Sequence, residues 1–330
     1  MGRIKTAVIG AGNMGMNHLR VCKALNHICE LTGVYDLDAE RRAEAAARYA
    51  IQAFDHIEDV WDSVDAVSIV TPTVTHYEIA KEALIRGLHV LLEKPITGTV
   101  AEGEELTRLA AAGGLALQIG HVERFNPAVQ VLPEILDGKE IIGLDFRRMS
   151  PYDPRIRDVG VVHDLMIHDI DVLRFLVPLD ITGIQAYGCA PRSGEHTDYA
   201  AASLLLDGGI IATLTASRVT EQKVRTLCIT TGEAYIEMDY IDRRITVARA
   251  THAHFYANSK TSYRQENITE KVFVPNREPL MDEIEAFLNC VLEGAAPLIG
   301  GEDGVAALAI ANRIEACVKA GHTNNNGVCI

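Results

Sequence analysis

A glycine-rich loop close to the N-terminus constrains the fold of this chain more than any other feature. The apolar run Ala7 to Ile9 stops at Gly10, and Gly10, Gly12 and Gly15 stand at G-x-G-x-x-G spacing before a predicted helix. The first glycine allows a tight exit from a strand, the second lets the backbone approach a pyrophosphate, and the third lets the helix pack closely on the strand. The loop therefore predicts a dinucleotide site in which the phosphates meet the helix N-terminus.

The next apolar segment supports this interpretation. Leu31 to Tyr35 ends in Asp36, about 20 residues after the last glycine, where a carboxylate accepts hydrogen bonds from ribose hydroxyls. Its charge repels a 2′-phosphate, so we expect NAD, with NADP as the less favoured cofactor. Arg41 and Arg42 follow and are expected to face solvent one turn into the next helix. The alternative is that Asp36 only caps the following turn.

Composition excludes several classes of protein. A chain of 330 residues suits two domains, and 48% hydrophobic with 23% charged residues is typical of a globular protein. The net charge of −14, without any basic run, argues against nucleic acid as a partner. Seven scattered cysteines, with neither a secretory signal nor a membrane span, favour a reduced protein in the cytoplasm.

Residues 1–121 alternate predicted strands and helices, which indicates a parallel sheet with helices on its faces. Ligands bind at the carboxyl ends of such strands. The expected cofactor contacts at this edge are Gly10, Gly12, Asn13, Met14, Gly15, Asp36, Thr71, Pro72, Thr73, Glu93, Lys94 and His121.

Residues 122–330 have a different pattern. Two predicted helices, Val122–Leu136 and Val159–Leu176, precede a series of strands, and Asp207-Gly208-Gly209 is typical of a hairpin turn. Consecutive strands without crossover helices predict an antiparallel sheet. The chain is therefore expected to be an α/β Rossmann domain, residues 1–121, plus an α+β domain with a large, mostly antiparallel open sheet, residues 122–330.

Glu93-Lys94-Pro95 at the end of a predicted strand is the first feature that suggests a reaction. A lysine beside the cofactor can donate a hydrogen bond to a substrate hydroxyl and stabilise the alkoxide that forms as hydride leaves. Proline fixes the direction of the chain, through either a trans or a cis bond. The alternative is an ordinary solvated lysine.

Asp164 and His168 lie four residues apart in a predicted helix and so share one face. Histidine is suited to accept the hydroxyl proton, and the aspartate can orient the ring or bind a second hydroxyl. Two alternatives remain: a structural histidine, or a metal site built with His163 and Asp169, for which no third ligand on the shared face is evident. We expect no metal.

Arginines gather around Tyr152 in an otherwise acidic chain: Arg124, Arg147, Arg148, Arg155 and Arg157. The guanidinium fork suits a phosphate or pyrophosphate, so the cluster suggests an anionic substrate. Solvated or salt-bridged charges are the alternative for any one of them.

Taken together, these motifs resemble the Gfo/Idh/MocA oxidoreductase family over essentially the whole chain. The matching stretches are Gly10–Gly15 with His18, Val34–Asp36, Thr71–His76, Glu93–Pro95 and Asp164–His168. The resemblance implies NAD(P)-dependent oxidation of a sugar or cyclitol hydroxyl. It makes Lys94 and His168 the catalytic pair, Asp164 the substrate-orienting acid and His76 a further cofactor contact. It also implies dimers or tetramers formed through the second-domain sheet.

Within the family, Gly120–Pro127 and Gly160–Asp171 most resemble the UDP-N-acetylglucosamine 3-dehydrogenase branch, which makes a 3-keto sugar for transamination and implies a place in lipid A biosynthesis. The substrate contacts are then expected to be Lys94, Arg124, Asn126, Tyr152, Arg155, Arg157, Asp164 and His168. The alternatives are a dehydrogenase of a free sugar or inositol, and a non-catalytic NAD-binding regulator.

Overall fold

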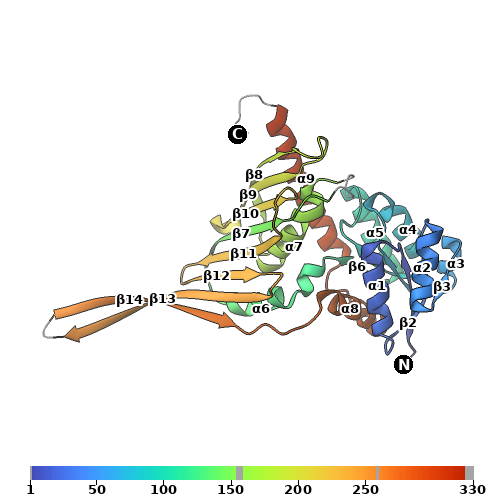
Figure 1. The fold of residues 1–330 in the computed structure, drawn as a ribbon, viewed down its shortest axis with the longest axis horizontal. Coiled ribbons are helices and arrows are strands. Elements are labelled where there is room, and N and C mark those ends of the chain that lie inside the picture. Colours follow the sequence, from blue (N-terminus) through green and yellow to red (C-terminus); the bar gives the residue numbers. More distant parts are fainter. Residues whose placement is uncertain (1, 154–158, 258–259, 324–330) are drawn as a thin grey trace. The chain divides into compact units, whose positions relative to one another are not determined.

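The computed structural model describes residues 2–153, 159–257 and 260–323, drawn in Figure 1. The chain divides into two compact units. The first consists of residues 1–125 and 277–309, and the second of residues 126–276 and 310–330.

The first unit is built on a six-stranded parallel sheet of order β3-β2-β1-β4-β5-β6. Its elements are β1 (Ile4–Ile9), α1 (Asn13–Ala24), β2 (Cys29–Tyr35), α2 (Ala39–Tyr49), β3 (Gln52–Ala53), α3 (Ile57–Trp61), β4 (Ala66–Ile69), η1 (Thr73–Thr75), α4 (His76–Ile85), β5 (His89–Glu93), α5 (Val100–Gly113), β6 (Leu117–Gly120), η2 (Val122–Phe125) and α8 (Pro279–Glu293). This order reverses direction between β1 and β4, the place where such sheets bind ligands.

Both faces of the sheet are covered, because successive side chains of a strand point to opposite faces. Ala7 and Ile9 of β1 join a core with α3, α4 and α5, whereas Val8 joins the core under α1 and α2. The central strands are consequently buried along most of their length, as the patterns of β1, β4, β5 and β6 show. The expected Rossmann architecture is confirmed.

Residues 277–309 differ from the division expected at residue 121, because they belong to the first unit. Leu280, Ile284 and Phe287 of α8 are buried in one core with Cys22 and Leu25 of the α1 region. An amphipathic helix packs wherever a complementary apolar face is available, even when the residues of that face lie far from the helix in the sequence.

His89 makes an additional link between β5 and β6. Its Nδ1 accepts the backbone N–H of Ala116 at 2.9 Å, so this nitrogen carries no proton in the folded chain. Burial lowers the pKa of His89, although the nearby Asp65 opposes this effect.

This geometry gives a testable pH dependence. The folded state binds fewer protons at His89 than the unfolded state, so the stabilisation is present above the ordinary histidine pKa of about 6.5 and is lost as the pH falls below it. His89→Asn keeps an acceptor but cannot titrate. Urea unfolding from pH 7.5 to 5.5 should show the wild type losing about 1 kcal/mol more than the variant, the worth of one hydrogen bond. Parallel curves would contradict the assignment.

The second unit is built on an eight-stranded sheet of order β14-β13-β12-β11-β7-β10-β9-β8. Its elements are α6 (Pro127–Leu136), β7 (Ile141–Met149), η3 (Val162–Met166), α7 (Ile167–Leu176), β8 (Ile181–Cys189), β9 (Tyr199–Leu206), η4 (Asp207–Gly209), β10 (Ile211–Ser217), β11 (Val224–Thr231), β12 (Ala234–Asp239), β13 (Arg244–Ala257) and β14 (Lys260–Val272). Helix α9 (Gly301–Thr323) begins in the first unit and ends in the second.

The expected mostly antiparallel sheet is confirmed, including the turn at Asp207–Gly209 between β9 and β10. One pair departs from the pattern, because β7 lies between β11 and β10 and runs parallel to β10. Strands β13 and β14 continue as a hairpin beyond the residues that pair with β12 (Figure 1). No helix among the described residues is long and apolar enough to cross a bilayer.

Candidate functional site

The glycine loop shows which glycines serve packing and which one leaves space for a ligand. Gly10 has φ of +101°, and a side chain there would overlap the Val70 carbonyl. A side chain at Gly15 would overlap the Gly10 carbonyl, so this glycine permits α1 to lie against β1. By contrast, nothing lies within 4 Å of a Cβ built at Gly12.

Gly12 is the N-cap of α1, and no described side chain caps this end of the helix. The first turn contains no acidic residue. Open backbone N–H groups at a helix N-terminus, beside a glycine with free space, suit the pyrophosphate of a dinucleotide. The residues present therefore fit NAD.

Gly12→Val should abolish NAD binding without unfolding the protein. The added carbons would occupy the space beside the N–H groups, and nothing lies within 4 Å of a Cβ at this position. We expect at least a 100-fold weaker Kd by calorimetry, about 2.7 kcal/mol, with an unchanged Tm in the absence of cofactor. Gly15→Ala is the matched contrast, because it should lower the Tm. Tight NAD binding by the Gly12 variant would contradict this location for the phosphates.

Asp36 lies at the end of β2 beside this loop. Its Oδ2 accepts the Ala11 N–H at 2.6 Å and its Oδ1 accepts the Asp38 N–H at 2.8 Å. Each carboxylate oxygen can accept more than one hydrogen bond, so the group retains capacity for ribose hydroxyls.

The expectation that Arg42 faces solvent is wrong. Its Nη1 donates to the Asp36 carbonyl at 2.8 Å and its Nη2 pairs with Asp55 at 2.8 Å, which leaves 12% of its side chain exposed. Helix α2 is capped by the Asp38 side chain, which places Arg42 in the first turn, within reach of both groups. Arg41 is exposed, as expected.

Lys94 is half-buried between two buried neighbours, and the Lys94–Pro95 bond is cis. Its backbone N–H donates to Glu93 Oε2 at 3.2 Å. On the other side, Glu93 Oε1 lies 3.2 Å from His18 Nε2, and His18 Nδ1 lies 2.6 Å from the Ser68 hydroxyl. A ring that donates from Nε2 and accepts at Nδ1 satisfies both partners.

Glu93 is ionised in this array. Burial alone would raise the pKa of its carboxyl, but the hydrogen bond from His18, the charge of Lys94 and the Lys94 backbone N–H together lower it. The side chain is 11% exposed, so it offers little surface to a ligand. We assign Glu93 to the support of the Lys94 turn.

His76, from the Thr71–His76 motif, supports the same turn from the other side. Its Nδ1 lies 2.8 Å from the Pro95 carbonyl and its Nε2 lies 2.9 Å from the Thr71 carbonyl. Burial lowers the pKa of His76, opposed by these two backbone contacts. His76 and His121 are each 1% exposed. At the surface of this edge, Thr75 Oγ1 donates to Thr71 Oγ1 at 2.8 Å.

Asp164 and His168 lie in η3 and α7 of the second unit, and both are half-buried. The η3 segment is a π-helix, a rare conformation that is frequent at functional sites. His163 Nε2 donates to Asn312 Oδ1 of α9 at 2.7 Å. Within the described ranges, no group of three or more His, Cys, Asp or Glu residues is arranged to hold a metal ion.

Each of the three described arginines of the predicted cluster pairs with a carboxylate. Arg148 is 1% exposed and paired with Asp169, Arg147 is exposed and paired with Asp145, and Arg124 is buried and paired with Asp303. Arg155 and Arg157 lie outside the described residues.

The other two predicted substrate contacts differ in exposure. Asn126 is 3% exposed, caps α6 by accepting the Ala128 N–H at 3.1 Å, and donates to the Tyr240 carbonyl at 3.1 Å. Tyr152 follows β7 and is 37% exposed.

Sequence reasoning gave no role to His18 or Ser68. A signal was available, since Ser68 is the one polar residue in the buried strand Ala66–Ile69 and His18 is a polar residue on the buried side of α1. Buried polar groups require hydrogen-bond partners, so a buried polar residue on a strand and another on a helix of the same unit predict a contact between them.

Comparison with known families gives two matches. Residues 4–121 match the model of an oxidoreductase family with an NAD-binding Rossmann fold, GFO/IDH/MocA, and residues 143–237 match the GFO/IDH/MocA C-terminal domain.

Among individual proteins, UDP-N-acetylglucosamine 3-dehydrogenase from Acidithiobacillus ferrooxidans is 34% identical over 97% of this chain and 99% of its own. Its solved structure has a TM-score of 0.87 over the same shares of the two chains. Inositol 2-dehydrogenase from Rhizobium meliloti is 25% identical over 94% of this chain and 95% of its own.

Proposed function

The chain belongs to the GFO/IDH/MocA oxidoreductase family, and from that premise we propose that it oxidises the 3-hydroxyl of UDP-N-acetylglucosamine to the 3-keto sugar, with NAD as oxidant. The observation that carries the proposal is the 34% identity to UDP-N-acetylglucosamine 3-dehydrogenase over nearly the full length of both chains. A product of this kind is a substrate for transamination, as in lipid A biosynthesis.

In the proposed reaction, NAD supplies the hydride acceptor. The N–H groups at the start of α1 hold its pyrophosphate, and Asp36 accepts hydrogen bonds from its ribose. His168 accepts the proton of the sugar hydroxyl, while Lys94 donates a hydrogen bond to the oxygen as negative charge develops there. Asp164 orients the sugar or the imidazole. Each of these assignments follows the family motif.

The decisive experiment incubates the purified protein with UDP-N-acetylglucosamine and NAD and follows the absorbance of NADH. A glutamate-dependent aminotransferase is added to remove the ketone and draw the reaction forward. Turnover that depends on the UDP group supports the proposal. Turnover with inositol or free sugars alone would identify the alternative dehydrogenase, and NAD binding without turnover on either class would identify a regulator.

We also propose that the protein acts in the cytoplasm as a homo-oligomer, paired through the open face of the second-unit sheet. One face of β8, β9, β10 and β12 exposes large apolar side chains: Tyr187, Tyr199, Leu205, Ile211 and Tyr235. The side chains on the opposite face of β9, β10 and β12 are buried. An apolar sheet face of this kind is typical of an interface between protein chains.

Ile211→Glu should therefore weaken self-association at least about tenfold, because it places a charge among the exposed apolar side chains of this face, opposite Leu205. Sedimentation velocity over a range of concentrations measures the effect. Ile85→Glu, at an exposed apolar position of α4, is the control and should leave the oligomer unchanged. A monomeric wild type would refute the proposal.

A further inference from the structure

Two buried arginines, one on β7 and one directly after β10, contact residues on either side of the Asp164–His168 segment. Arg148 of β7 pairs in register with Ala216 of β10, and Arg218 follows Ala216 by two residues. Side chains two residues apart share one face of a strand, so both arginines lie on the face against which η3 packs. Arg148 is 1% exposed and Arg218 is 3% exposed.

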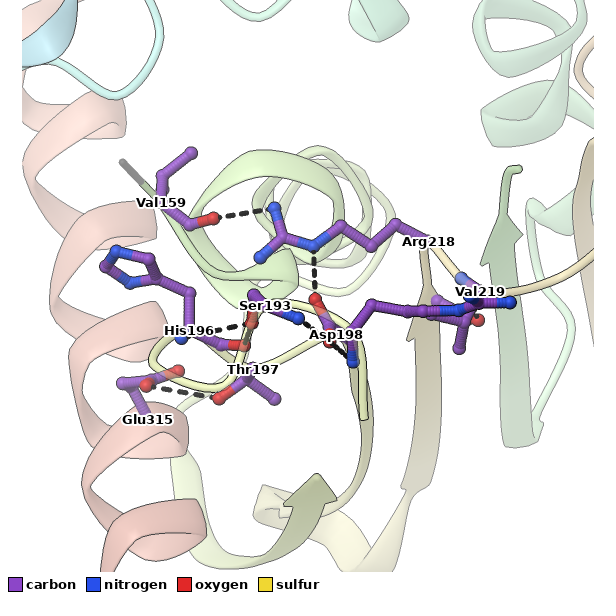
Figure 2. Close-up of polar contacts among 10 residues, drawn as sticks. Val159, Ser193, His196, Thr197, Asp198, Arg218, Val219 and Glu315 are labelled. Carbon is purple, nitrogen blue, oxygen red and sulfur yellow. Dashed lines mark hydrogen bonds and ion pairs between the residues drawn. The ribbon is translucent and has the colours of Figure 1, made fainter. Parts of the chain in front are cut away.

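Arg218 holds the entry to the segment, as Figure 2 shows. Its Nε donates to Asp198 Oδ1 at 2.8 Å and its Nη1 donates to the Val159 carbonyl at 2.9 Å. Two residues further on, the Val161 N–H donates to the Thr197 carbonyl at 2.8 Å. The backbone that leads into η3 is thereby fixed at two points.

Asp198 is the anchor of this contact. Its Oδ2 accepts the backbone N–H groups of Arg192 and Ser193 at 2.7 and 2.8 Å. Burial would raise the pKa of its carboxyl, but these N–H groups and Arg218 together lower it, so the group is ionised opposite the guanidinium. The 190–198 loop, Arg218 and the helix entry therefore form one connected array.

Arg148 holds the segment at its other side, directly after His168. Its Nε lies 3.1 Å from both carboxylate oxygens of Asp169 and its Nη2 lies 2.7 Å from Oδ1. The guanidinium also lies over the Tyr240 ring, 5.1 Å from the centroid. Arg148 thus contacts Asp169 through two of its nitrogens while the Tyr240 ring lies against its guanidinium.

We propose that Arg148 and Arg218 are positioning residues. They fix the rotation of the helical segment about its axis and its distance from the sheet, and thereby the placement of Asp164 and His168. A buried ion pair is weak as a source of stability, because apolar side chains hold a helix on a sheet equally well. A guanidinium group also fixes the orientation of its partner, since its N–H donors lie in one plane and meet their acceptors in one geometry. The inference rests on the proposed catalytic role of His168.

Arg218→Lys and Arg148→Lys test it, because lysine keeps the charge and loses the second arm of the fork. We expect kcat to fall about 10- to 100-fold, as for a displacement of about 1 Å at a reacting group. KM for the sugar and Kd for NAD should change less than about threefold, since ground-state binding is kept. Backbone hydrogen exchange in residues 160–168 should rise about tenfold or more.

Thr197→Val is the matched control. It removes the 3.4 Å contact with Glu315 of α9 from the same array but keeps the carbonyl that accepts the Val161 N–H. Unchanged kcat in both lysine variants, even with a lower Tm, would overturn the inference. If one lysine variant fails to bind NAD, the other provides the same measurements, because both arginines are proposed to act on the same segment.

Failure of the proposed function is separable from failure of this inference. If the wild type oxidises no sugar, hydrogen exchange still decides. Faster exchange in residues 160–168 of the lysine variants than in Thr197→Val supports the positioning role, and equal exchange rejects it.

Discussion

His168→Asn should lower kcat for sugar oxidation about 10²- to 10⁴-fold, the usual contribution of a general base. Asparagine is close to histidine in size but cannot accept the hydroxyl proton, so the loss measures chemistry more than packing. Single-turnover kinetics with substrate deuterated at C3 separates hydride transfer from product release. A larger isotope effect in the variant would show that the chemical step has become limiting.

His163→Asn is the matched control, because it changes the same residue type five positions earlier in the same segment. Its imidazole donates to Asn312, so we expect a loss of about 1 kcal/mol in stability with little change in kcat. If His168→Asn retains more than half of the wild-type kcat, another group accepts the proton.

Lys94→Met should lower kcat about 10²- to 10³-fold, the usual effect of removing one donor from a developing oxyanion. Methionine has nearly the same length and no charge, so the Glu93–Lys94–Pro95 turn can keep its backbone contacts. Kd for NAD should remain near the wild-type value, because the proposed role is in the transition state. Lys94→Arg should recover part of the loss.

Lys81→Met is the control for this variant. Lys81 lies in the same unit and pairs with Glu105 at 2.8 Å on the surface of α4. Surface ion pairs contribute little, so both kcat and Tm should stay close to wild type. Equal kcat in the Lys94 and Lys81 variants would remove Lys94 from the mechanism.

The two units differ in how far their sequence predicts them. In the first unit the signals are local: the apolar run Ala7–Ile9, the three glycines and Asp36 lie within one β-α-β unit, where short-range sterics decide the backbone. In the second unit, β7 lies between β10 and β11, strands that follow it by more than sixty residues. Such pairing depends on which strands fit best beside one another in the whole sheet. The residues of a single strand do not show which neighbours it will have.

The candidate site divides in the same way. The sequence by itself determined Gly12, Asp36, Lys94, Asp164 and His168 as candidates, because each combines a reactive or permissive residue type with a position at an element's end or face.

Only the tertiary structure decided which polar residues are buried against one another. It pairs His18 with Glu93 and Arg148 with Asp169, so an expected cofactor contact and an expected anion contact each have a buried partner within the protein. It also pairs Arg218 with Asp198, two residues that were not among the candidates. A buried charge must find an opposite charge, and the partner is chosen by three-dimensional proximity, whereas sequence shows only that a charge is present.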